Sequence, residues 1–67
     1  MQIETEELVR RVLERCFEEP PPYSTDLSYD IIGRIQRCPE LRREYEALGD
    51  EGTVNQWIGK AVRALTN

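Results

Sequence analysis

Residues 52–67 of this 67-residue chain read GTVNQWIGKAVRALTN. Apolar side chains recur there every three or four positions: Val54, Trp57, Ile58, Ala61, Val62 and Leu65. This spacing places them along one stripe of an α-helix. Thr53 and Gln56 also match the S/T-x-x-E/Q pattern of a capping box, in which each side chain bonds a backbone N–H of the first turn. The sequence therefore predicts a helix over 53–66, with Trp57 in the core.

The N-terminal part of the chain carries a second, broader stripe. Its members are Leu8, Val9, Val12, Leu13, Cys16 and Phe17. We expect a helix over about 5–18, with Thr5 as the N-cap and Cys16 on the buried side. Pro20 cannot continue that helix, because proline lacks a backbone N–H and clashes with the preceding turn.

Residues 19–24 are expected to form a Pro-rich connector. Pro20, Pro21 and Pro22 favour a stiff, extended polyproline II segment. Two interpretations of this run are open: a rigid spacer between helices, or, together with Tyr23, a ligand for an aromatic groove. The spacer is favoured, because no repeated PxxP pattern surrounds the run.

Two further helices are expected, over 25–37 and 39–48. Residues 24–26 are N-cap types, Pro39 suits a first helical turn, and Gly49 suits a helix stop. Gly33 inside the second helix would be explained by a close helix crossing. The predicted fold class is all-α, a single domain over 1–67. It is a small four-helix orthogonal bundle, with helix 5–18 packed across a three-helix cluster over 25–67.

Composition excludes several classes of protein. The net charge is −4, and the lack of any long apolar run argues against a membrane span. The chain has no histidine, and Cys16 and Cys38 match no metal spacing, so we expect neither a metal nor another cofactor. Two isolated cysteines, without a signal peptide, suit the cytoplasm, and Cys38 is the one expected at the surface. Catalysis and a small-molecule substrate are also not expected, because no catalytic motif is present.

The last predicted helix leaves one alternative function open. Asn55, Gln56, Lys60 and Arg63 lie on its polar side and are residue types that read base edges. Residues 40–66 would then form a helix-turn-helix-like unit of a DNA-binding regulator. Asp50 and Glu51 precede this helix and would repel phosphates. Nucleic acid is therefore the less favoured partner.

The favoured function is a small protein-interaction or regulatory module. A chain of this length buries only about 60% of its unfolded surface, so association with a protein partner or a second copy would add stability. The broad stripe of the first helix supplies the candidate partner-binding residues Leu8, Val12 and Phe17. The charge is uneven as well, because residues 1–30 hold eight acidic and three basic side chains.

Overall fold

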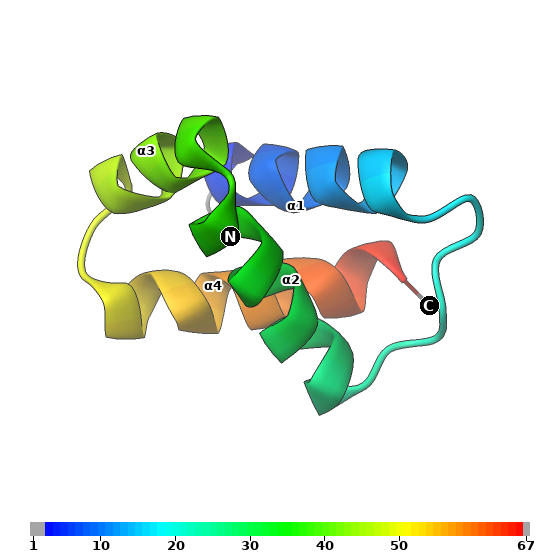
Figure 1. The fold of residues 1–67 in the computed structure, drawn as a ribbon. Coiled ribbons are helices and arrows are strands. Elements are labelled where there is room, and N and C mark those ends of the chain that lie inside the picture. Colours follow the sequence, from blue (N-terminus) through cyan, green and yellow to red (C-terminus); the bar gives the residue numbers. More distant parts are fainter. Residues whose placement is uncertain (1–2, 67) are drawn as a thin grey trace.

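Four α-helices make up the fold of residues 3–66, the part of the chain that this computed structural model describes. They are α1 (Ile3–Cys16), α2 (Thr25–Arg37), α3 (Pro39–Ala47) and α4 (Glu51–Leu65), as Figure 1 shows. No strand occurs in these residues. The all-α class predicted from the spacing of apolar residues is confirmed. Within the same residues, no helix combines the length and apolar composition needed to cross a membrane.

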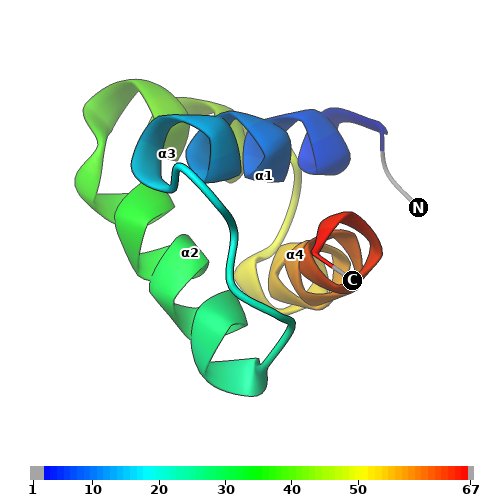
Figure 2. The ribbon, with the colours of Figure 1, turned by 90° about the vertical axis from the view of Figure 1, so that its right-hand side faces the viewer.

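The most extensive helix contact is between α1 and α4, the first and last elements of the chain. The next is between α2 and α3, and α3 also packs on α1, whereas α3 and α4 touch least. Figure 2 views α4 along its axis, with α1 and α2 lying across it. The first helix is therefore an integral layer of the bundle, rather than an addition to a finished three-helix cluster.

One hydrophobic core joins all four helices. Ile31 and Ile35 of α2 and Val54, Ile58 and Val62 of α4 are fully buried in it. The radius of gyration is 10.6 Å, against about 11 Å expected for a compact domain of this length. The accessible surface of 4550 Å² is likewise close to the roughly 4,400 Å² expected for a compact monomer of this mass.

The stripe of α1 faces this core. Leu8 and Val12 are 2% and 1% exposed, and Val9 and Leu13 are buried beside them. The prediction that Leu8 and Val12 form a partner-binding surface is therefore corrected: α2, α3 and α4 of the same chain cover them. The interior of the bundle, rather than a second protein, accounts for the width of this stripe.

The first residues of α4 differ from the sequence prediction. The helix begins at Glu51, and the Asp50 carboxylate caps it by accepting a hydrogen bond from the Thr53 backbone N–H at 3.1 Å. Thr53 thus lies inside the first turn and is not the N-cap, because Asp50, three residues earlier, is the better capping residue. Gly49 adopts a positive φ of 146° and turns the chain immediately after α3, as predicted for a helix stop.

Helix α1 is also displaced from its predicted bounds. Thr5 is not its N-cap: the helix already includes Ile3, and Thr5 is fully buried. Glu4 and Glu6 in the first turn favour this earlier start, because carboxylates stabilise the positive end of the helix dipole. The helix ends at Cys16, before Glu18 and Glu19, whose charges would be unfavourable at its negative end.

Three predictions about single residues need correction as well. Cys16 is exposed instead of buried: at the last residue of α1, the neighbouring Phe17 packs against the core and Cys16 does not. Cys38 is half-buried at the junction of α2 and α3. A Cβ on Gly33 would meet the Arg37 guanidinium at 3.0 Å and no atom of another helix, so no close helix crossing explains this glycine.

Candidate functional site

Helices α1 and α4 end on the same side of the molecule, next to the connector between α1 and α2 (Figures 1 and 2). A groove with an apolar floor opens there. It consists of two adjoining hollows of about 360 and 280 Å³ that share Pro20 and Leu65. We call it the connector-end groove. Its lining residues are Arg10, Leu13, Glu14, Phe17, Glu18, Pro20, Pro22, Leu65 and Thr66.

The floor of the connector-end groove follows from where the two helices stop. Leu13 and Phe17 are four residues apart, and the Phe17 backbone N–H still donates to the Leu13 carbonyl at 3.2 Å, which keeps both side chains on one side. Leu65 is the last residue of α4. Leu13 is buried, whereas Phe17 and Leu65 are only half-buried, because no further helical turn covers them. Large apolar side chains therefore remain in contact with water here.

Carboxylates dominate the rim on the α1 side. Arg10 is the one basic residue in the lining, and its guanidinium bonds Glu7 at 2.9 Å and Glu6 at 3.2 Å. Within residues 3–66, Glu14 and Glu18 make no ion pair. The lining on this side thus holds two carboxylates and one guanidinium, and Glu6 and Glu7 already offset the charge of that guanidinium.

The connector forms the opposite wall. Pro20 and Pro22 are exposed, and Pro21 is half-buried. The Arg63 guanidinium of α4 lies over the Tyr23 ring, 5.7 Å from its centroid, a distance at which cation–π attraction operates. On the α2 side, Arg34 lies over the Phe17 ring at 5.2 Å. These two contacts fasten the connector to the helices at both ends, which favours the spacer interpretation of the proline run.

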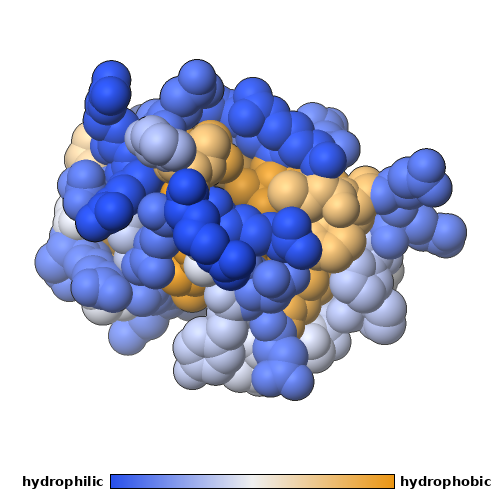
Figure 3. All heavy atoms as spheres, viewed as in Figure 1, coloured by the Kyte–Doolittle hydropathy of each residue, from blue (hydrophilic) through white to orange (hydrophobic). Residues whose placement is uncertain are grey.

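Apolar surface is also visible on the face shown in Figure 3. It appears between α1 and α2 and extends toward the connector, with hydrophilic side chains around it. Phe17 and Ile32 are both half-buried apolar residues packed against the core. Because Arg34 of α2 lies over the Phe17 ring, Phe17 belongs both to the groove floor and to the contact between α1 and α2.

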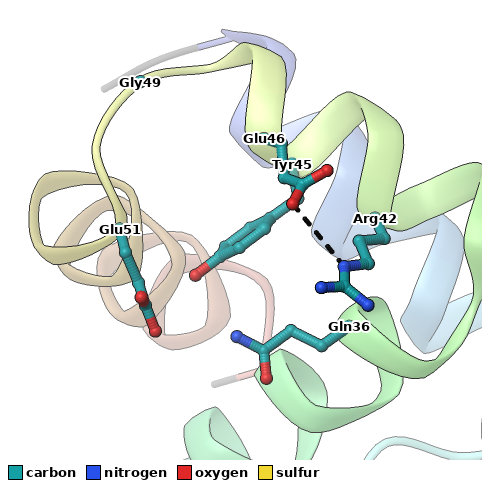
Figure 4. A pocket seen from close by; sticks show the side chains of 6 residues that line it. All are labelled: Gln36, Arg42, Tyr45, Glu46, Gly49 and Glu51. Atoms are coloured by element: carbon teal, nitrogen blue, oxygen red, sulfur yellow. Dashed lines mark ion pairs between the residues drawn. The ribbon is translucent and has the colours of Figure 1, made fainter.

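A second hollow, of about 370 Å³, lies at the opposite end of the molecule, beside the turn between α3 and α4. We call it the turn-end hollow. In Figure 4, Tyr45 stands in its middle, with Gln36 and Arg42 on one side and Glu51 on the other. Arg42 and Glu46 form a loose ion pair at 3.6 Å, and both are about 60% exposed. Water satisfies such side chains well, so this lining does not itself require a partner.

The four residues predicted to contact nucleic acid differ in their exposure to solvent. Gln56, Lys60 and Arg63 are exposed on α4, as predicted. Asn55 is half-buried, and its amide oxygen accepts a 2.8 Å hydrogen bond from the Tyr45 hydroxyl. Asn55 therefore has a structural role between α3 and α4, which the capping-box pattern in the sequence did not reveal.

The start of α4 is also occupied by a negative charge. Hydrogen bonds from Thr53 hold the pKa of Asp50 below its ordinary value, so this carboxylate is ionised at neutral pH. It fills the position where a phosphate would meet the first N–H groups of the helix. The connection from α3 to α4 is as short as in a helix-turn-helix, but the limited contact between these helices gives no support to that motif.

Of the predicted partner-binding residues, the structure brings only Phe17 to the groove. Leu65, which the sequence stripe assigned to the core, lies beside it on the floor. Trp57, also assigned to the core, is half-buried and packs against the buried core residues. The position of Leu65 at the very end of its helix was the available signal, since a terminal turn lacks neighbours on one side.

Within residues 3–66, no three His, Cys, Asp or Glu side chains lie close enough together to hold a metal ion. Searches against protein-family models, curated proteins and solved structures find no match to this chain.

Proposed function

We propose that this chain is a small cytoplasmic protein-interaction module that binds a partner protein in the connector-end groove. The supporting observation is the half-buried pair Phe17 and Leu65 on the floor of a 360 Å³ hollow. Covering these side chains would remove apolar surface from water, which is the main driving force of protein association.

The composition of the groove supports a protein partner. Binding interfaces place apolar and aromatic anchors at the centre and polar groups at the rim. Here Leu13, Phe17 and Leu65 form the centre, and Glu14 and Glu18 lie at the edge. The hollow is at the lower end of the range of about 300–1,000 Å³ for small-molecule sites, and it is wide open to solvent along the surface. It has room for a few side chains of a partner.

Selection from a displayed library of random peptides tests this proposal. We expect enriched peptides that bind at micromolar concentration and that shift the NMR signals of Leu13, Phe17 and Leu65. Leu65→Ser should abolish binding. Leu48→Ser is the matched control, because Leu48 is also half-buried against the core but is the C-cap residue of α3, outside the groove.

Two results would contradict a partner in the groove. One is the absence of any peptide that prefers the unchanged protein to Leu65→Ser. The other is a second copy of the chain already occupying the groove: sedimentation at micromolar concentration would show a dimer, and Leu65→Ser would convert it to a monomer. In that case the module is a homodimer rather than a receptor for another protein.

DNA binding is the second candidate, and the exposed face of α4 favours it. Gln56, Lys60 and Arg63 share that face, and Gly59 beside them has open space where a side chain would lie, so DNA could approach the helix closely. Titration with random duplex at two salt concentrations tests this candidate. Binding that weakens as salt rises and is reduced in Lys60→Ala supports it. If no complex forms at low salt, DNA binding is excluded.

A further inference from the structure

We propose that the partner segment for the connector-end groove is amphipathic and basic, with lysine or arginine residues flanking its apolar anchors. This inference rests on the proposed function, and it concerns which segments the groove accepts. It follows from the charges around the apolar floor, considered one by one.

The α1 edge of the groove carries excess negative charge. Glu14 and Glu18 line the hollow and have no cationic partner within the described residues 3–66. Arg10 does not offset them, because Glu6 and Glu7 already engage its guanidinium from the preceding turn. Lysine or arginine from a bound segment would supply the missing partners for Glu14 and Glu18.

Two cations close to the groove, Arg34 and Arg63, already make contacts within the chain. Arg34 donates to Asp30 at 3.2 Å while it lies over the Phe17 ring. Arg63 lies over the Tyr23 ring at the far end of the connector. The connector wall itself, Pro20 to Pro22, carries no charge. The positive residues of the segment are therefore expected on the side that faces α1, with its apolar residues on Phe17 and Leu65.

The rim carboxylates should act mainly on selection and on the rate of association. They are exposed, so water and salt screen each of them and a single pair adds little affinity. A basic segment would still be attracted and an acidic one repelled. We expect about a tenfold preference for a basic segment at low salt, and a smaller preference as salt rises.

Two synthetic peptides test this inference by fluorescence anisotropy. Both place leucines at helical i, i+3, i+4 and i+7 positions, and they differ only in having lysine or glutamate at the remaining positions. The lysine peptide should bind about ten times more tightly in 50 mM salt, and the ratio should fall in 200 mM salt. The double variant Glu14→Gln/Glu18→Gln should bring the two affinities within about threefold. Glu40→Gln is the matched control, because Glu40 is exposed on α3 outside the groove.

The outcomes separate this inference from the proposed function. Equal binding of both peptides, lost in Leu65→Ser, would overturn the preference for basic segments and leave the interaction module intact. Tighter binding of the glutamate peptide would have the same consequence. A preference for lysine that survives Glu14→Gln/Glu18→Gln would assign the selection to other residues and also overturn the inference. If neither peptide binds and peptide display yields no ligand, the proposed function itself fails.

Discussion

The two ends of this molecule hold hollows of nearly the same size and opposite chemistry. The turn-end hollow measures about 370 Å³ and is lined by charged and polar side chains, including Arg42, Glu46 and Glu51. The larger part of the connector-end groove measures about 360 Å³ and has Leu13, Phe17 and Leu65 on its floor. Volume therefore does not distinguish the two sites.

The two sites differ in how favourably their lining side chains interact with water. Exposed charged groups keep their hydration, and an ion pair such as Arg42–Glu46 adds little to it. Half-exposed apolar groups gain free energy whenever another surface covers them. This difference is why we propose the connector end, and not the turn end, as the site of partner binding. Four predictions test this division, in order of decreasing effect.

The largest effect is expected in the core that both ends share. Ile58 is fully buried, so Ile58→Ala should lower the free energy of unfolding by about 2–5 kcal/mol. Leu65→Ala at the groove should cost only about 1 kcal/mol, because Leu65 is only half-buried. Urea unfolding followed by Trp57 fluorescence measures both. Equal losses would mean that Leu65 is a core residue, and the distinction between groove and core would be lost.

Gly49→Ala tests the structural role of the turn end. The φ of 146° at Gly49 strains any residue with a Cβ, so the substitution should cost about 1–3 kcal/mol. Gly59→Ala provides the control, because a Cβ there meets nothing within 4 Å and alanine should stabilise α4 by up to about 1 kcal/mol. Thermal unfolding by circular dichroism measures both. A neutral Gly49→Ala would show that the turn tolerates another conformation.

Removing either of two hydroxyl groups should change the stability of the fold, in opposite directions. The Tyr45 hydroxyl, in the turn-end hollow, donates to Asn55, so Tyr45→Phe should lose about 1 kcal/mol of stability. Within residues 3–66 the buried Ser28 hydroxyl has no hydrogen-bond partner, so Ser28→Ala should gain about 0.5–1 kcal/mol. Urea unfolding measures both changes. A loss in Ser28→Ala would reveal a partner, such as a buried water molecule, for that hydroxyl.

The smallest effect is the pH dependence of the turn end. Hydrogen bonds from Thr53 lower the pKa of Asp50 in the folded state. A lowered carboxyl pKa gives stability that is fully present above the unfolded value of about 4 and is lost as pH falls through the folded pKa. Asp50→Asn retains a capping side chain. Its stability should therefore fall less than that of the unchanged protein on acidification below about pH 4, and parallel acid curves would contradict this role.

Helix content was predictable because it depends on local periodicity. Val54, Ile58, Ala61 and Val62 repeat at helical spacing, and they are buried as the spacing indicates. Helix ends were less predictable, because several nearby residues can serve as the N-cap and the sequence does not show which of them does. At the start of α4, Asp50 is the N-cap residue instead of Thr53. Helix α1 starts earlier than predicted, so Thr5 lies inside its first turn.

The groove was predicted in part. Phe17 was expected to contact a partner, but Leu8 and Val12 were expected beside it and lie in the core instead. A sequence stripe shows which side chains share a helix face, and it does not show which turns of that face another helix covers. Pro20 and Leu65, which are 45 residues apart in the sequence, meet at the groove only through the packing of α1 on α4.

The sequence by itself determined that this chain forms four amphipathic helices, that a proline run joins the first two, and that its acidic residues are concentrated in the first half. Only the tertiary structure decided which apolar residues are enclosed and which remain at the surface. The physical reason is the range of the forces involved. Helix formation depends on residues three and four positions apart, whereas burial depends on elements that meet after distant parts of the chain have folded together.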